Sequence, residues 1–207
     1  MKIKELKKKE HEKTLENLMK LLKQKDEQQI YEVEPEIVEW AKLHAKFFID
    51  RYKERPDIHW TPKQWRNAYV GMVGHKCFEV ILQQFEIPYV PNDPAIRDWW
   101  SRKYDFLVPP LGRIEVKAFD HHCKYALFKL SEWHGCNYAV VFRFCDPEPK
   151  NVNLEGWLTG AEVENLPIAE KGKMKISRYE DCRYTPFKKL NPASKFIKLL
   201  KKISVEG

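Results

Sequence analysis

Two short strand-like runs separated by a proline- and glycine-containing turn constrain this chain more than any other feature. The runs cover residues 104–108 and 113–118. Side chains on a strand alternate in direction, so Glu115 and Lys117 share one face, while the apolar residues around them share the other. The apolar face predicts a place in the core. An acid and a lysine on a half-buried strand are costly to desolvate, which favours a site where a metal ion and a phosphate bind.

The length of the turn decides whether Asp105, on the first run, faces Glu115. Residues directly opposite each other in a hairpin point to the same side. Asp105 therefore faces Glu115 only if the register centres on Pro110, which requires a loop with an odd number of residues. Gly112 can adopt a positive φ and close such a turn. The Cβ atoms of the two acids would then lie roughly 5 Å apart, close enough to share one divalent ion. The alternative is a surface hairpin with solvated charges.

Composition limits the class of protein. The chain has 207 residues, 43% of them hydrophobic, which predicts one domain with appendages. Its net charge of +7 and pI near 9.0 are compatible with a polyanionic partner. We find neither a transmembrane run nor a secretory signal and expect no obligate membrane association. Five scattered cysteines predict reduced thiols in an intracellular setting: cytoplasmic, nucleoid-associated, or inside the host cell for a viral protein. The abundance of lysine and glutamate indicates a thermophilic source.

Periodicity predicts helices over residues 1–30, 35–51, 61–85, 127–134, 161–166 and 194–203. Strands are predicted over 87–90, 104–108, 113–118, 138–144 and 157–159, with 138–144 the strongest and central. Residues 170–190 are predicted to be polar and irregular. The expected organisation is a charged N-terminal extension (1–34), a domain over 35–190 with its core at about 62–145, and a basic C-terminal helix or tail (191–207).

The order helix, strand, strand, strand, helix, strand, with Asp105 on the second strand and Glu115-Val116-Lys117 on the third, resembles the PD-(D/E)XK nuclease superfamily. The resemblance implies an α/β protein with a restriction-endonuclease-like core (αβββαβ). In that core a central mixed sheet is flanked by helices, and here extra N-terminal helices and the C-terminal basic helix would be added. The Holliday-junction-resolvase-like and RecB-like subgroups are the candidates. No proline precedes Asp105, and no glutamine motif follows Lys117.

The helix before the hairpin carries two candidates for a further metal ligand. Gly71-Met72-Val73-Gly74-His75 is similar to the Gly-x-x-x-His of RecB-type members, in which the histidine binds metal. Glu79, one turn later, is the competing candidate.

The resemblance implies a Mg²⁺- or Mn²⁺-dependent deoxyribonuclease. Asp105, Glu115, the Val116 carbonyl and either His75 or Glu79 would hold the ion. Lys117 would orient or help to deprotonate the attacking water, so the expected catalytic residues are Asp105, Glu115 and Lys117. We expect an endonuclease, with a role in junction resolution, recombination or repair. The alternatives are a RecB-like single-strand exonuclease and a non-catalytic nucleic-acid-binding module.

DNA also requires a surface of positive charge and aromatic rings. Five residues just before Asp105 combine these properties and are the candidate DNA contacts; they are Arg97, Trp99, Trp100, Arg102 and Lys103. Closure of the core by one or both tryptophans is the alternative. Members that cut both strands are commonly symmetric dimers, so a homodimer is expected, with the N-terminal helix as a pairing surface.

Two other patterns leave alternatives open. The C-terminal helix could lie along DNA, lie on an anionic membrane, or dock its apolar face on the domain and leave its lysines in water. The cluster His121-His122-Cys123, with His134, Cys136 and Cys145, could suggest zinc, although its spacings fit no standard site.

Overall fold

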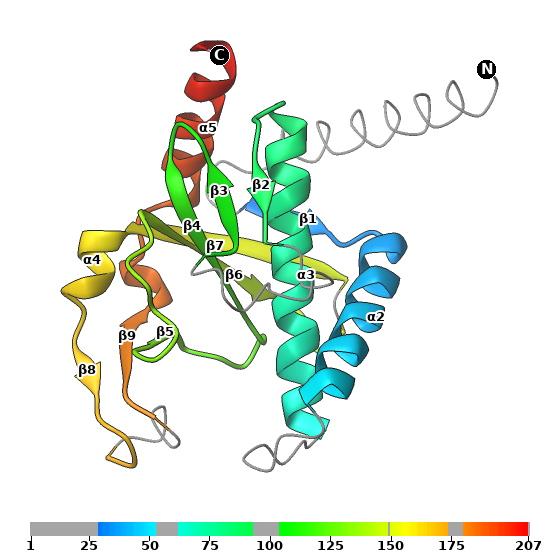
Figure 1. The fold of residues 1–207 in the computed structure, drawn as a ribbon, viewed down its shortest axis with the longest axis vertical. Coiled ribbons are helices and arrows are strands. Elements are labelled where there is room, and N and C mark those ends of the chain that lie inside the picture. Colours follow the sequence, from blue (N-terminus) through cyan, green and yellow to red (C-terminus); the bar gives the residue numbers. More distant parts are fainter. Residues whose placement is uncertain (1–28, 53–61, 93–103, 149, 174–179, 207) are drawn as a thin grey trace.

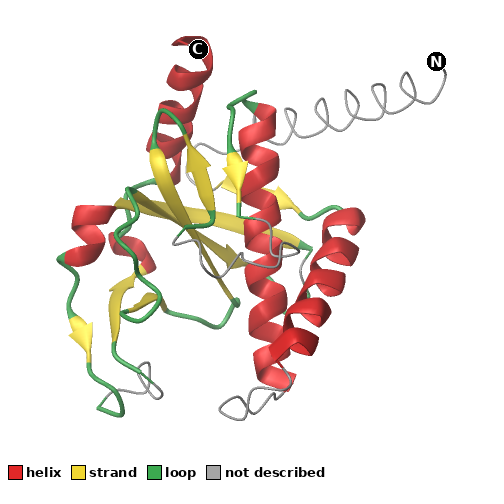
Figure 2. Cartoon of the chain, in the orientation of Figure 1, coloured by secondary structure: helices red, strands yellow, loops and turns green. Residues whose placement is uncertain are grey.

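The computed structural model describes residues 29–52, 62–92, 104–148, 150–173 and 180–206, which form a mixed α/β fold with two sheets (Figures 1 and 2). In chain order the elements are β1 (Gln29–Glu32), α2 (Pro35–Tyr52), α3 (Pro62–Gln84), β2 (Val90–Pro91), β3 (Phe106–Val108), β4 (Gly112–Phe119), β5 (Tyr125–Lys129), β6 (Tyr138–Phe144), β7 (Asn151–Thr159), α4 (Gly160–Glu164), β8 (Ile168–Ala169), β9 (Cys182–Pro186), the 3₁₀-helix η3 (Phe187–Lys189) and α5 (Ala193–Glu206).

The larger sheet has six strands in the order β1-β7-β6-β4-β3-β2 and is visibly curled (Figure 1). Strands β4 and β6 pair in parallel, and the other neighbouring pairs are antiparallel. A parallel pair needs a long crossover. Here the crossover carries β5, which belongs to the second sheet, β5-β9-β8.

Each face of the larger sheet is buried by a different layer. Alternate residues of β6 divide between the layers: Val140 and Phe142 join the cluster under the helices, whereas Ala139 and Val141 join the cluster under the smaller sheet. Helix α3 covers the first face, with α2 packed beside it (Figure 2). The smaller sheet and η3 cover the second face.

The hairpin β3–β4 has the register that places Asp105 opposite Glu115. Phe106 pairs with Ile114 and Val108 pairs with Gly112, so the loop has three residues and centres on Pro110. Gly112 has a φ of 82°, a conformation that glycine adopts without a Cβ clash. The prediction of an odd loop closed by this glycine is confirmed.

The helix predicted over residues 127–134 is wrong, because this segment contains most of strand β5 followed by a turn. The three-residue spacing of Leu127, Leu130 and Trp133 favoured a helix. The residues that are buried, however, are Ala126 and Phe128, which are spaced by two. Their partners on β9 lie more than fifty residues further along the chain, so a local pattern could not reveal the strand.

Residues 170–190 are also more regular than predicted, because they contain β9 and η3. The strand predicted at 157–159 is the end of the nine-residue β7. The helices predicted at 35–51, 61–85 and 161–166 correspond to α2, α3 and α4 within a few residues.

The terminal segments differ in outcome. The predicted C-terminal helix is present as α5, and its apolar face is docked on the domain: Phe196, Ile197 and Leu200 are buried. Most of the helix predicted over residues 1–30, including its apolar stripe, lies outside the described residues. Gln29 and Ile30 belong to β1, which pairs with β7 at the edge of the larger sheet.

Candidate active site

Asp105 lies where β3 separates from β4. Its backbone N–H donates to the Ile114 carbonyl at 3.0 Å, and its carboxylate accepts the Val116 N–H at 2.7 Å. The Asp105 carboxylate thus accepts the hydrogen bond of the Val116 N–H at the point where the backbone pairing between β3 and β4 has ended. This contact holds the carboxylate against the edge of β4.

Glu115 and Lys117 point to the same face of β4, as their spacing predicted. The Lys117 Nζ lies 2.7 Å from a Glu115 carboxylate oxygen, and the two side chains are only 21% and 13% exposed. Their strand neighbours on β6 are the buried residues Ala139 and Val141, so one side of the ion pair is apolar. The structure therefore brings Asp105, Glu115 and Lys117 together.

The electrostatics of this group are dominated by burial and by the proximity of two acids. Burial raises the pKa of Asp105 above its ordinary value, against the opposing effect of Lys117. Burial and the Asp105 charge raise the pKa of Glu115 to about 7, although Lys117 opposes this shift. Burial disfavours the charged form of Lys117, but the surrounding carboxylates outweigh it and raise the pKa of its ammonium group. A cation bound between these two carboxylates would stabilise their ionised forms and lower both pKa values.

Glu132, which the sequence analysis did not single out, is a third acid at this site. Its carboxylate lies 3.5 Å from the Lys117 Nζ, and it reaches the lysine from the turn after β5. Burial raises the pKa of Glu132, but Lys117 and Lys129 outweigh it and lower the pKa. The local sequence carries no signal for this contact, because only the pairing of β5 with β9 brings the turn over β4.

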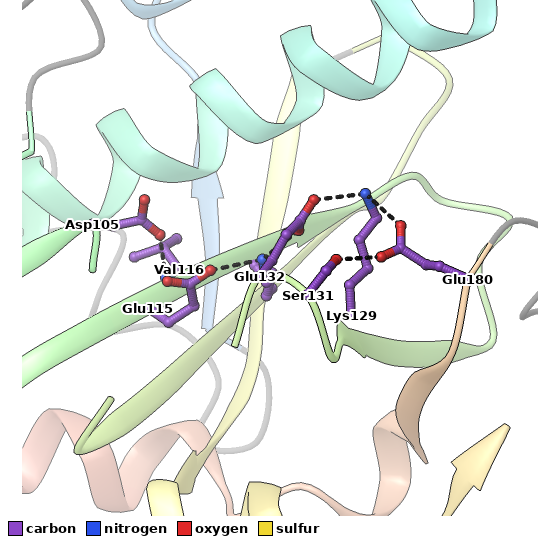
Figure 3. Close-up of polar contacts among 8 residues, drawn as sticks. Asp105, Glu115, Val116, Lys129, Ser131, Glu132 and Glu180 are labelled. Carbon is purple, nitrogen blue, oxygen red and sulfur yellow. Dashed lines mark hydrogen bonds and ion pairs between the residues drawn. The ribbon is translucent and has the colours of Figure 1, made fainter. Parts of the chain in front are cut away.

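Glu132 connects the site to the smaller sheet through a row of polar contacts (Figure 3). Lys129 Nζ lies 2.6 Å from a Glu132 carboxylate oxygen and 3.1 Å from one of Glu180, which lies two residues before β9. The Ser131 hydroxyl donates to Glu180 at 2.5 Å. The turn that carries Glu132 is therefore bonded to Lys117 on β4 and to Glu180 beside the smaller sheet.

The two candidate ligands on α3 lie on the first face of the sheet, with other partners. The His75 ring packs on Phe106, with centroids 4.4 Å apart. Glu79 bonds to Lys76 at 2.5 Å and accepts from the Tyr89 hydroxyl at 2.9 Å. Glu115 and Lys117 point to the opposite face. The choice between His75 and Glu79 stays a prediction.

Within the described ranges, one group of three His, Cys, Asp or Glu side chains has ligand atoms within 4.8 Å of one another, and it consists of Asp120, His121 and His122. The predicted set built on Asp105 and Glu115 with a residue from α3 is not such a group. The zinc set that would add Cys123, His134, Cys136 and Cys145 to the histidines is not one either.

The predicted DNA contacts at Arg97, Trp99, Trp100, Arg102 and Lys103 lie outside the described residues. The residues that flank this segment are close to each other, since the Asn92 N–H donates to the Asp105 carbonyl at 2.7 Å.

Comparison of the chain with protein-family models, curated proteins and solved structures found no match. Among the helices of the described ranges, none is both long and apolar enough to cross a membrane.

Proposed function

We propose that this chain is a metal-dependent nuclease that hydrolyses DNA phosphodiester bonds, with a restriction-endonuclease-like core of the PD-(D/E)XK type. The observation that carries the proposal is the convergence of Asp105, Glu115 and Lys117 at the point where β3 leaves β4. All three are partly buried, and both carboxylates have raised pKa values. Apolar side chains at these positions would stabilise the fold at least as well as partly buried charges, so stability alone does not explain the charges.

The topology around these residues supports the proposal. Helix α3 precedes three consecutive antiparallel strands, β2, β3 and β4, and β6 then pairs with β4 in parallel. This order agrees with the expected αβββαβ arrangement except that the crossover carries a strand in place of the second helix.

The donor set fits a hard divalent cation. Asp105 and Glu115 would hold Mg²⁺ or Mn²⁺ through carboxylate oxygens, the ligands that these ions prefer. When bound, the ion would offset negative charge on the phosphate and lower the pKa of a coordinated water. Lys117 would orient the attacking water and stabilise charge on the scissile phosphate, while Glu115 keeps the ammonium group in place. The active form of Glu115 is ionised, so its raised pKa predicts that cation binding strengthens as pH rises through about 7.

Plasmid nicking tests the proposal. With Mg²⁺ or Mn²⁺ the wild-type protein should convert supercoiled to nicked or linear DNA, and a chelator should stop the reaction. Glu115→Gln and Lys117→Ala should each reduce the rate by at least about 100-fold, since each removes a group that acts in the transition state.

The matched control is Glu155→Gln. Glu155 is also a mostly buried acid in the larger sheet, 11% exposed and ion-paired with Arg143, but it lies on β7 away from the site. The Glu155→Gln variant should cleave plasmid DNA at the wild-type rate. Circular dichroism would establish that all variants are folded. Unchanged turnover in folded Glu115→Gln or Lys117→Ala would rule out this site.

The form of DNA separates the enzyme classes. Cleavage of four-way junctions in preference to linear duplex would assign a junction-resolving endonuclease. Stepwise release of nucleotides from single strands would assign a RecB-like exonuclease. Binding without cleavage in any metal would leave the non-catalytic module.

A further inference from the structure

A tight turn directly after β4 gathers an acid and two histidines outside the proposed active site. The turn is closed by the Cys123 N–H, which donates to the Asp120 carbonyl at 3.0 Å. One ligand atom each from Asp120, His121 and His122 lies within 4.8 Å of the other two. The two imidazole rings are 5.3 Å apart and nearly perpendicular. Their separation and orientation allow one ion to reach both rings.

The acid of this group is held in place by an arginine from another part of the fold. The Arg66 guanidinium, on α3, donates to both Asp120 oxygens, from Nε at 2.8 Å and from Nη2 at 3.1 Å. The same Nη2 donates to the Pro147 carbonyl at 2.5 Å, in the connection between β6 and β7. Arg66 therefore ties the turn after β4 to α3 and to the connection between β6 and β7. A carboxylate fixed in this way loses little conformational freedom when it binds an ion.

Asp120 also organises the first histidine. Its Oδ1 accepts the backbone N–H of His121 at 2.9 Å and lies 2.7 Å from the His121 Nδ1. Burial raises the pKa of Asp120, but the hydrogen bonds from Arg66 and His121 outweigh it and hold the pKa well below its ordinary value. The carboxylate is therefore charged throughout the neutral range.

The three side chains of the group differ in their exposure to solvent. Asp120 is 12% exposed, His121 is 36% exposed, and His122 is exposed. Asp120, the least exposed member, supplies the fixed charge, and the more accessible histidines leave room for water or another ligand on the ion.

We propose that Asp120, His121 and His122 form a binding site for one divalent transition-metal ion, separate from the Asp105–Glu115 pair. Imidazole nitrogen favours Zn²⁺, Co²⁺ or Ni²⁺ over Mg²⁺, whereas Asp105 and Glu115 offer only hard oxygen ligands. Three protein ligands with remaining positions open to solvent are the pattern of an accessible zinc site. Asp120 and the imidazoles bind the ion, and Arg66 is a positioning residue.

Calorimetric titration of the full-length, metal-free protein with Zn²⁺, and visible absorption of its Co²⁺ complex, test the site in the absence of nucleic acid. The wild-type protein should bind one equivalent. His121→Ala, His122→Ala and Asp120→Asn should each weaken binding at least about tenfold, and Arg66→Gln should weaken it less, as expected of a residue outside the coordination shell.

Two control variants test whether the Zn²⁺ binding is specific to this group. His134→Ala removes another exposed histidine, which is not part of the group, and should bind like the wild type. Cys123→Ser tests whether the neighbouring thiol supplies the affinity. Because His122 is exposed, His122→Ala should leave the thermal midpoint of the metal-free protein unchanged.

The proposal is overturned if the His121→Ala/His122→Ala double variant, folded by circular dichroism, binds Zn²⁺ as tightly as the wild type. Loss of binding in Cys123→Ser alone, with both histidine variants unaffected, would also overturn it by assigning the ion to thiols. Glu115→Gln should bind Zn²⁺ normally whether or not the chain is a nuclease, so the outcome is independent of the proposed function.

Discussion

At the scale of single residues, the proposed active site consists of charged groups that the fold holds close together, although burial and repulsion between the acids disfavour their ionised forms. Asp105 is fixed by the Val116 N–H, and Glu115 by Lys117. Glu132 adds a third negative charge beside the same ammonium group. Because the two strand acids repel each other in a partly buried place, their protonation is coupled to stability.

This coupling predicts how stability changes with pH in the absence of divalent ions. The pKa of Glu115 is about 7 in the folded protein and near its ordinary 4.5 when unfolded. Below pH 4.5 both states hold the proton, so the contribution of Glu115 to stability is fully present and does not change with pH. Between pH 4.5 and about 7 the unfolded state releases the proton first, so the contribution of Glu115 to the free energy of unfolding falls as pH rises.

Urea denaturation of the wild type and Glu115→Gln across this pH window measures the effect. The wild type should lose stability relative to the variant as pH increases, and the difference should level off above about pH 7. Asp105, whose pKa is raised in the same direction, should leave a dependence of the same sign in the variant. Parallel pH profiles of the two proteins would contradict the assigned electrostatics.

At the scale of elements, the contact between α3 and β4 positions the hairpin. A Cβ added at Gly74 would overlap the Cβ of Ala118 on β4. A side chain at this position would push the helix away from the strand that carries Glu115 and Lys117. The second glycine of α3, Gly71, is exposed and has nothing within 4 Å of an added Cβ.

The two glycines provide a matched pair of variants. Gly74→Ala should lower the free energy of unfolding by about 1–3 kcal/mol, because it overpacks the interface. Gly71→Ala should raise it by about 0.5–1 kcal/mol, because alanine is the better residue inside a helix. Denaturant titration gives both values.

The double variant Gly74→Ala/Ala118→Gly restores the space and should recover most of the loss. Equal stability of Gly74→Ala and Gly71→Ala would mean that the close approach of α3 and β4 is not as described. Failure of the double variant to recover would place the strain elsewhere.

At the scale of the whole molecule, α5 closes the core despite its many lysines. Phe196 is 1% exposed, and its ring lies 5.7 Å from Trp157 on β7 and 6.2 Å from Phe78 on α3. The C-terminal helix thus joins the larger sheet to its covering helix. The lysines at 198 and 201 face solvent.

Substitution on the two faces of α5 should separate stability from charge. Phe196→Ala should destabilise the protein by about 3–5 kcal/mol through loss of buried area and the cavity left behind. Lys198→Gln/Lys201→Gln should change stability by less than about 0.5 kcal/mol for each residue. Thermal unfolding measures both variants, and a destabilisation by the lysine variant comparable to that of Phe196→Ala would contradict the docked arrangement.

Local pattern in the chain was enough to predict the hairpin and the common face of Glu115 and Lys117, because both follow from strand alternation. The odd loop was a condition of the predicted site, and the register and the positive φ of Gly112 meet it. The C-terminal helix also follows from the sequence, because its apolar residues recur at helical spacing, but its docking on the domain was one of three alternatives and is shown by the burial of Phe196, Ile197 and Leu200. Three features became visible only in the folded chain: the strand and turn at residues 125–134, the contact of Glu132 with Lys117 on β4, and the ion pair between Asp120 and Arg66. Each of these depends on pairing or contact between residues about fifteen to sixty positions apart, which leaves no periodic trace in the local sequence.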